Sequence, residues 1–85
     1  MSELDDRFAA AADASRTLPE RPDNDTMLKL YSLYKQGSVG DIQGKRPGFT
    51  DPVGRAKYDA WSKIKGTSSE DAKGQYADLI ESLGG

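Results

Sequence analysis

The chain has 85 residues, and its 12 basic and 14 acidic side chains leave a net charge of −2. This length allows one small domain, expected to cover residues 1–85. The absence of cysteine and histidine excludes disulfides, thiolate nucleophiles, imidazole bases and the usual zinc sites. Leu, Ile, Val and Phe together make up less than roughly 20% of the residues, a share at which a chain can be disordered. In this chain, however, these residues recur with a helical period. We therefore expect a folded domain with a small core.

The first two predicted helices lie in the N-terminal half. Hydrophobic or small residues spaced as on one helical face run from Leu4 to Leu18, and Pro19 closes this first helix. Residues 22–25 supply capping oxygens and negative charge for a second helix, expected from about residue 25 to Gly37.

The second predicted helix has one continuous face of Leu, Met and Tyr side chains when its residues are projected around the helix axis. Lys29, Ser32 and Gln36 lie opposite, so this second face is expected to be polar. Lys35, in contrast, falls within the hydrophobic face.

A long connection follows, from about residue 38 to residue 53, and it is rich in Gly and Pro. Helix connections in small bundles usually take about 2–8 residues, so a connection of this length is expected to have a function. Its glycines match neither a P-loop nor a G-x-G-x-x-G pattern.

Asp51 and Pro52 give an N-cap and a first-turn proline for a third helix, which is expected to end near residue 66. Trp61 and Ile64 define its inward stripe, and Lys57, one turn earlier, lies on that stripe.

A fourth helix is predicted near the C-terminus. Ser68 and Asp71 resemble a capping box, and hydrophobic residues from Ala72 to Leu83 mark one helical face. Helical periodicity therefore dominates the chain. The longest hydrophobic run, residues 8–12, is too short to span a bilayer, and the N-terminal residues are acidic. We expect no signal peptide, no integral membrane association and a cytoplasmic location.

Basic residues concentrate between residues 26 and 65, while both flanking segments are acidic. Such a segment is often a solvated surface, but it can also bind a polyanion. Lys35 and Lys57 favour the second interpretation because both project onto hydrophobic faces beside aromatic residues. Their stems could lie along apolar surface with the ammonium groups in water. A buried ammonium without a partner is costly, so otherwise both should face carboxylates or an anionic ligand.

Arg16, Tyr31, Tyr34 and Tyr76 would complete a concave surface that carries cations and aromatic rings. Tyrosines at helical spacing often belong to a core. Together with the two lysines, however, they suit a nucleotide, because a base stacks on tyrosine and phosphates accept charge-assisted hydrogen bonds.

Four segments carry a family resemblance: YSLYKQGSVGD at residues 31–41, RPG at 46–48, KYDAW at 57–61 and GTS at 66–68. In these segments and over nearly its whole length, the chain closely resembles the acyl-CoA-binding protein family. The resemblance implies an all-α, four-helix, up-down-down-up bundle shaped like a bowl, with a long loop between the second and third helices. It also implies a monomeric, non-enzymatic carrier that binds, transports and buffers medium- to long-chain fatty acyl-CoA. No cofactor, metal site or catalytic residue is expected.

The resemblance also assigns roles to residues. Lys35 and Lys57 would hold the 3′-phosphate and its neighbours, Tyr31 a phosphate or the adenine, and Tyr76 the nucleotide and pantetheine side. Arg16 would support the head group, and Ala12 would let the adenine approach closely. Met27, Leu28 and the inner surface of the loop would meet the acyl chain. The complete expected acyl-CoA site is Ala12, Arg16, Met27, Leu28, Tyr31, Ser32, Leu33, Tyr34, Lys35, Arg55, Lys57 and Tyr76.

Three departures from the family pattern are visible. Tyr58 stands where tryptophan is usual, and Val53 stands where many members have a lysine, a contact that Arg55 could replace. Residues 36–38 read Gln-Gly-Ser instead of Gln-Ala-Thr, which is expected to loosen the helix end by about 1 kcal/mol.

Two other functions find less support in the sequence. A protein- or nucleic-acid-interaction module could use the basic central segment, although the pI of about 5.0 argues against a nucleic-acid partner. Thioester hydrolysis is disfavoured because the chain has no histidine, no cysteine and no serine in a nucleophile-elbow setting.

Overall fold

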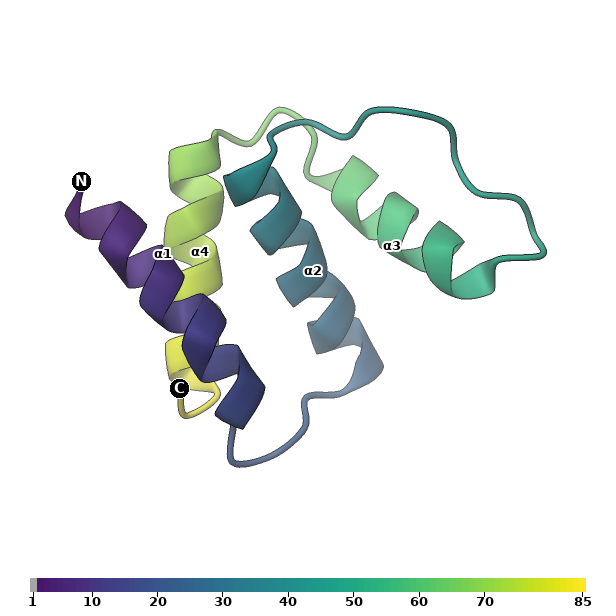
Figure 1. Cartoon of the computed structure of the whole chain (residues 1–85). Coiled ribbons are helices and arrows are strands. Elements are labelled where there is room, and N and C mark those ends of the chain that lie inside the picture. Colours follow the sequence, from purple (N-terminus) through teal and green to yellow (C-terminus); the bar gives the residue numbers. More distant parts are fainter. Residues whose placement is uncertain (1) are drawn as a thin grey trace.

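The computed structural model describes residues 2–85, which form four α-helices, one short 3-10 turn and no strand (Figure 1). The elements are α1 (Glu3–Ala14), η1 (Ser15–Thr17), α2 (Asn24–Ser38), α3 (Pro52–Lys63) and α4 (Ser69–Ser82). In Figure 1, α2 and α3 run in one direction and α1 and α4 in the other. The predicted all-α, up-down-down-up bundle is thereby confirmed.

The predicted helix starts are also confirmed, because side chains cap the first backbone N–H groups. The Asp23 carboxylate accepts a hydrogen bond from Thr26 N at 2.8 Å. The Asp51 carboxylate accepts one from Gly54 N at 3.0 Å, and Ser68 Oγ accepts one from Asp71 N, also at 3.0 Å. Each bond satisfies a donor that has no partner inside the helix.

Three predicted helix ends differ from the structure. The third helix, expected to end near residue 66, ends at Lys63. The first helix leaves α-geometry at Ser15, where the serine hydroxyl donates to Ala12 O at 2.7 Å and the chain tightens into a 3-10 turn. The second continues through Gly37 to Ser38. Gly37 is buried, and a Cβ there would lie 3.0 Å from Lys73 Cγ and 3.3 Å from Phe8 Cζ. This glycine therefore permits close helix packing and does not end the helix.

The polar face predicted for the second helix is only partly exposed, because Lys29 is in water but the other two residues are buried. Ser32 is 2% exposed and Gln36 is 1% exposed. The Ser32 hydroxyl donates to Lys29 O at 2.8 Å, and the Gln36 amide bonds to groups outside α2. α2 is therefore covered on both sides, by α4 on one and by α3 on the other.

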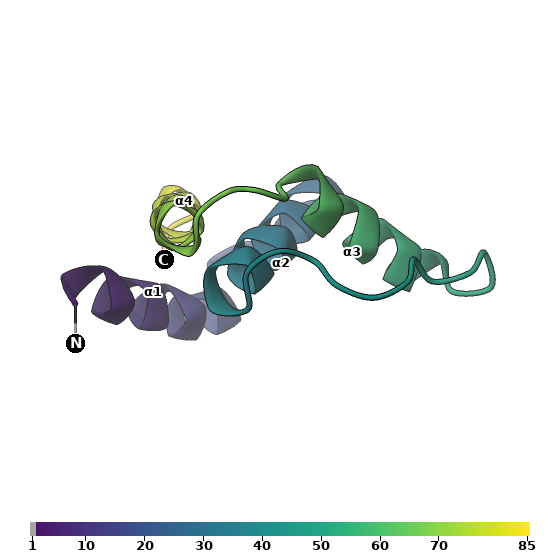
Figure 2. The same cartoon turned by 90° about the horizontal axis from the view of Figure 1, so that it is seen from above.

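The hydrophobic core lies among α1, α2 and α4. Its buried members are Ala11, Leu30, Leu33, Ala72, Tyr76, Ala77 and Ile80. α3 contributes no buried residue, and its predicted inward residues Trp61 and Ile64 are half-buried. The molecule measures 37 × 28 × 15 Å and is flat, as Figure 2 shows from above.

Gln36 ties the long loop, residues 39–51, to the helices. Its Nε2 donates to Asp41 Oδ1 at 2.8 Å and to Thr67 O at 2.7 Å, and its Oε1 accepts from Trp61 Nε1 at 3.0 Å. Asp41 Oδ1 also accepts from Gly66 N at 2.8 Å. One buried amide thus connects α2, the loop, α3 and the turn before α4.

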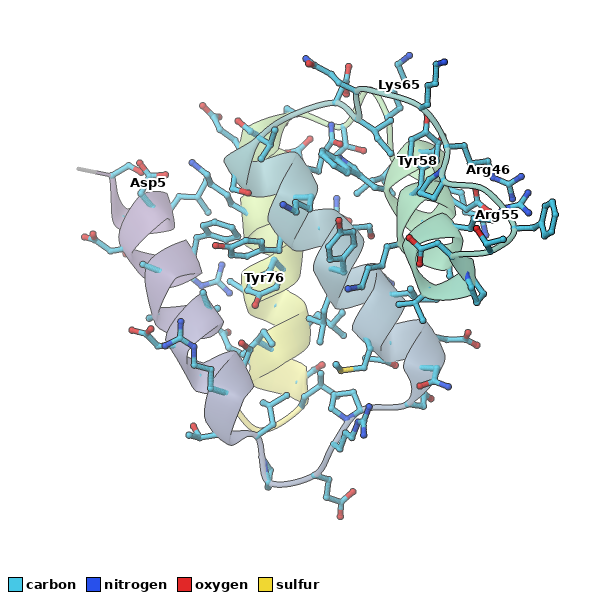
Figure 3. All side chains as sticks on the ribbon, turned by 45° about the vertical axis from the view of Figure 1, so that its right-hand side comes forward. Asp5, Arg46, Arg55, Tyr58, Lys65 and Tyr76 are labelled. Atoms are coloured by element: carbon cyan, nitrogen blue, oxygen red, sulfur yellow. The ribbon has the colours of Figure 1, made fainter. Side chains whose placement is uncertain are left out.

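The far part of the loop is fastened to α3. Arg46 Nε and Nη2 donate to the two carboxylate oxygens of Asp59, at 2.8 and 2.7 Å. Tyr58 Oη donates to Gly44 O at 3.0 Å. Figure 3 shows Arg46 and Tyr58 at the same end of the molecule.

None of the helices within residues 2–85 is long and apolar enough to cross a membrane.

Candidate functional site

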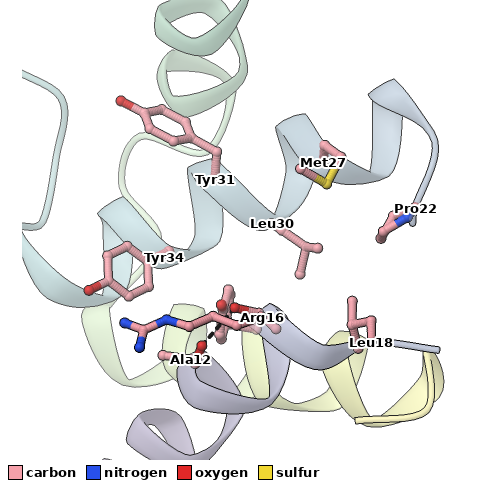
Figure 4. Close-up of a pocket in the computed structure, with 10 residues that line it drawn as sticks. Ala12, Arg16, Leu18, Pro22, Met27, Leu30, Tyr31 and Tyr34 are labelled. Atoms are coloured by element: carbon pink, nitrogen blue, oxygen red, sulfur yellow. Dashed lines mark hydrogen bonds between the residues drawn. The ribbon is translucent and has the colours of Figure 1, made fainter. Parts of the chain in front are cut away.

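A cleft of about 360 Å³ opens between α1 and α2. Tyr76 of α4 contributes to its lining, and the Arg16 side chain extends along it toward Tyr34 (Figure 4). The residues that line this cleft are Ala12, Ser15, Arg16, Leu18, Pro22, Met27, Leu30, Tyr31, Tyr34 and Tyr76. It therefore offers aromatic and apolar surface together with one guanidinium group.

A second cavity, of about 640 Å³, lies between α2 and α3. Its lining is mainly apolar, with Lys57 and Arg21 as its cations; the residues are Arg21, Asn24, Met27, Leu28, Tyr31, Pro52, Val53, Ala56 and Lys57. Met27 and Tyr31 line both cavities. The two cavities are therefore neighbours that share these two side chains as a common wall at this edge of α2.

Two lysines flank the Tyr31 ring at the junction of the cavities. Lys57 Nζ of α3 lies 5.2 Å from the ring centroid, and Lys35 Nζ of α2 lies 5.9 Å from it. Lys35 Nζ is also 6.0 Å from the Trp61 ring. These distances allow cation–π attraction. Neither lysine forms an ion pair with a carboxylate among residues 2–85, so both charges can meet an anion.

Neither ammonium group needs an internal partner, because Lys57 is exposed and Lys35 is half-buried. The prediction that both lysines lie on the hydrophobic side of their helices is confirmed by their position around Tyr31. Neither lysine therefore carries the free-energy cost of an ammonium group that is buried without a partner.

Phe8, Tyr34 and Tyr76 form an aromatic cluster beside the first cavity. Ring centroids lie 5.5 Å apart for Phe8 and Tyr34, and 5.3 Å apart for Phe8 and Tyr76. Tyr76 is 4% exposed and belongs to the core, whereas Tyr34 is 41% exposed. Tyr76 thus combines a packing position with a place in the wall of the cavity.

Most of the residues predicted for the site lie around the two cavities. Ala12, Arg16, Met27, Tyr31, Tyr34 and Tyr76 line the first, and Leu28 and Lys57 join Met27 and Tyr31 in the second. Lys35 reaches the same place through its ammonium group beside Tyr31.

Three predicted residues lie elsewhere. Leu33 is 2% exposed and is part of the core. Ser32 lines a third cavity, formed by other residues of α2 and α3. Arg55 is half-buried, and its Nε has no hydrogen-bond partner. A role of these three in ligand binding stays a prediction.

The sequence interpretation missed the segment that leads from α1 to α2. Leu18, Pro22 and Arg21 of this segment line the cavities, but the sequence predicts from this segment only the end of one helix and the start of the next. Ala56 and Leu30 were also missed as lining residues. Their apolar character was a sufficient signal for burial, but it could not distinguish a core contact from a cavity wall.

Within residues 2–85 there is no group of three or more His, Cys, Asp or Glu residues placed to hold a metal ion. The chemistry that the site offers is therefore that of its cations, aromatic rings and apolar walls.

A family model described as "Acyl CoA binding protein" matches residues 5–80. The chain is 45% identical over 80 residues to the acyl-CoA-binding protein homolog of Drosophila melanogaster, covering 94% of this chain and 93% of that protein. It is 46% identical over 76 residues to acyl-CoA-binding protein homolog 1 of Caenorhabditis elegans, covering 89% and 88%.

Solved structures agree with these matches. Acyl-CoA-Binding Protein 2 of Oryza sativa superposes with a TM-score of 0.89 at 38% identity, covering 94% of this chain and 89% of that chain. ACBP of Moniliophthora perniciosa gives a TM-score of 0.87 at 36% identity, covering 98% and 80%.

Proposed function

This chain belongs to the acyl-CoA-binding protein family, and from that premise we propose that it binds medium- to long-chain fatty acyl-CoA esters without transforming them. The observation that carries the proposal is the Tyr31 ring, which lies between two lysines at the junction of a cleft and an apolar cavity. An acyl-CoA has a matching division into an anionic nucleotide and a hydrocarbon chain.

The nucleotide head fits the first cavity. An adenine there would stack on tyrosine, worth about 1–3 kcal/mol, close to Ala12 and the guanidinium of Arg16. Its phosphates would face the ammonium groups of Lys35 and Lys57, where charge-assisted hydrogen bonds contribute about 1.5–3 kcal/mol each. Because these lysines have no carboxylate partner, a phosphate need not displace an internal ion pair.

The acyl chain fits the second cavity. Met27, Leu28, Val53 and Ala56 line it with apolar surface, and burial stabilises the complex by about 0.8 kcal/mol per methylene. A long chain therefore contributes more free energy than any single polar contact. The length of the acyl chain should therefore change the binding affinity, while the two lysines should make binding depend on the CoA head.

A protein with this site would act as a carrier and buffer of acyl-CoA. We propose that it works as a monomer and as a single acyl-CoA-binding domain of residues 1–85, in the cytoplasm. The site offers cations and aromatic rings, and its one serine, Ser15, donates its hydroxyl hydrogen bond to Ala12 O.

Titration calorimetry with palmitoyl-CoA, free CoA and palmitate tests the proposal. We expect sub-micromolar binding of palmitoyl-CoA, weaker binding of CoA and the weakest binding of palmitate, because only the first ligand uses both cavities. If none of the three bound with sub-micromolar affinity, the proposal would be wrong.

A further inference from the structure

The second cavity, between α2 and α3, has two chemically different ends. At one end Lys57 Nζ lies 5.2 Å from the centroid of the Tyr31 ring. The two helices run in the same direction (Figure 1), so the other end is formed by their first residues, Asn24 of α2 and Pro52 of α3, which both line the cavity. Asn24 lies seven residues before Tyr31 in α2, a rise of about 10 Å. The cavity therefore extends from Lys57 to the starts of the two helices.

The far end of this cavity, at the helix starts, is polar. Apolar side chains of both helices line most of the cavity. At the far end, Asn24 contributes an amide with two N–H donors, and Arg21, three residues earlier, contributes a guanidinium group. Both residues are exposed. A methyl group at the end of a bound hydrocarbon chain would make no hydrogen bond to either side chain.

The Arg21 guanidinium is available to an anion. It forms no ion pair within residues 2–85, although Glu20, Asp23 and Asp25 are close to it in the sequence. Asp23 caps α2 by accepting a hydrogen bond from Thr26 N, and Asp25 lines a different cavity. A guanidinium group can bind a carboxylate through two parallel hydrogen bonds. Because this end of the cavity is open to water, a carboxylate there would keep part of its hydration.

We propose that Arg21 and Asn24 select acyl-CoA esters whose chain carries a carboxylate at its far end, which are the CoA monothioesters of dicarboxylic acids. The inference rests on the proposed function and names the chemical class of the acyl chain. Such a ligand has anionic groups at both ends and methylene groups between them. The protein offers the matching order, with two lysines beside Tyr31, then apolar walls, then the Arg21 guanidinium.

Titration calorimetry with matched pairs of ligands tests the proposal. The two members of a pair have equal chain length but end in a methyl group or in a carboxylate: octanoyl- and octanedioyl-CoA, dodecanoyl- and dodecanedioyl-CoA, palmitoyl- and hexadecanedioyl-CoA. The measured quantity is the ratio of the two Kd values within a pair, because contacts of the CoA head cancel in this ratio.

The two ligand series should depend differently on chain length. The affinity for methyl-ended chains should rise steadily with length, since each methylene adds apolar burial. The affinity for carboxylate-ended chains should pass through a maximum at the length that places the carboxylate beside Arg21, because a carboxylate among apolar walls is costly. At this length the carboxylate-ended ligand should bind at least as tightly as its methyl-ended partner.

Two substitutions test the residues themselves. Arg21→Gln should weaken binding of the best carboxylate-ended ligand about fivefold relative to its methyl-ended partner, the upper range for an exposed ion pair. Asn24→Asp should shift the ratio in the same direction by adding a negative charge, although an acidic residue in the first turn of a helix favours folding. Lys29→Gln is the matched control, because Lys29 is an exposed cation of α2 that lines a different cavity. Circular dichroism checks that each variant is folded.

Three results would overturn the proposal. In the first, carboxylate-ended ligands bind more weakly than their methyl-ended partners at every length. In the second, Arg21→Gln leaves the ratio unchanged while methyl-ended ligands still bind, which leaves the proposed function in place. In the third, Arg21→Gln and Lys29→Gln change the ratio equally, which shows a response to net charge alone. Failure of the proposed function is distinguishable, because then no member of any pair would bind and both proposals would be wrong.

Discussion

The side chain of Gln36 is nearly inaccessible to water, at 1% exposure, and joins three segments of the chain through its amide. We expect Gln36→Ala to lower the free energy of unfolding by about 2–4 kcal/mol, because it leaves buried partners unsatisfied and opens a cavity. Urea unfolding followed by circular dichroism measures the change. The control is Gln75→Ala, at an exposed position of α4, for which a change within about 0.5 kcal/mol is expected. Similar losses in both variants would contradict the role given to Gln36.

Lys57 should matter for ligand binding and little for folding. Its side chain is exposed and its ammonium group faces the Tyr31 ring. Lys57→Ala should weaken palmitoyl-CoA binding about tenfold or more, the equivalent of one charge-assisted hydrogen bond, with little change in melting temperature. Lys63→Ala, an exposed position of the same helix, should leave the affinity nearly unchanged. If Lys57→Ala lowered the free energy of unfolding by as much as it lowered the free energy of binding, Lys57 would instead have a packing role.

At the scale of residues, helical projection was a reliable guide for Lys35 and Lys57, which do converge on Tyr31. It gave no sign that Gln36, on the polar side of the second helix, is buried. Two of its three partners, Trp61 and Thr67, are 25 and 31 residues away in the sequence, and the third, Asp41, lies in the loop, so the helical pattern alone could not indicate its burial.

The start of α3 depends on a cap that leaves no room for a side chain at Gly54. An added Cβ would overlap the Asp51 carboxylate, which accepts the hydrogen bond from Gly54 N. Gly54→Ala should therefore leave the free energy of unfolding nearly unchanged, because about 1 kcal/mol of helix propensity offsets a similar loss of capping.

A matched substitution is available in α4. A Cβ at Gly74 would make only an ordinary contact, with Leu4 Cδ1 at 4.0 Å, so Gly74→Ala should stabilise the protein by about 1 kcal/mol. Thermal or urea unfolding of the two variants provides the comparison. An equal gain in both would contradict the expected conflict between a Cβ at residue 54 and the Asp51 cap.

Acid should weaken the attachment of the loop. Hydrogen bonds from Gly66 N and Gln36 lower the pKa of Asp41 below its ordinary value of 3.8, and the hydrogen bond from Arg46 lowers the pKa of Asp59 in the same way. Since the folded-state values are lowered, the stabilisation is fully present above about pH 4 and is lost as the pH falls through the folded pKa.

Urea midpoints measured between about pH 6 and pH 3 check this expectation. The midpoint should fall toward acid, and the fall should be smaller for Asp41→Asn, which keeps an acceptor but cannot be protonated in this range. An unchanged acid dependence in this variant would contradict the contribution of Asp41.

At the scale of elements, the helical period of the hydrophobic residues and the N-cap residues were sufficient to predict the four helices. Asp23, Asp51 and Ser68 each accept a hydrogen bond from a backbone N–H only three residues further on, so these caps depend on local sequence alone. The hydrogen bonds that fasten the loop could not be predicted. They join Arg46 to Asp59 and Gly44 to Tyr58, and depend on how the loop returns to α3.

The whole molecule is a flat bundle whose buried hydrophobic side chains come from three of its four helices. The small number of large hydrophobic residues in the sequence fits this shape, since the cavities on both edges of Tyr31 are lined but not filled by the chain. A ligand that binds only the folded state should supply the missing contacts. At a hundredfold excess over its dissociation constant it would raise stability by about 2.7 kcal/mol.

α3 has no buried residue and packs on α2. A helix attached in this way can detach as a cooperative unit while the other helices stay folded. Its amide protons should therefore exchange with deuterium faster than those of α2 and α4, and palmitoyl-CoA should protect α3 most strongly, because the helix forms one wall of the acyl cavity. Hydrogen-exchange mass spectrometry measures both effects, and uniform protection in all four helices would contradict them. The opening rate of this one helix would then limit how fast a bound acyl chain can leave.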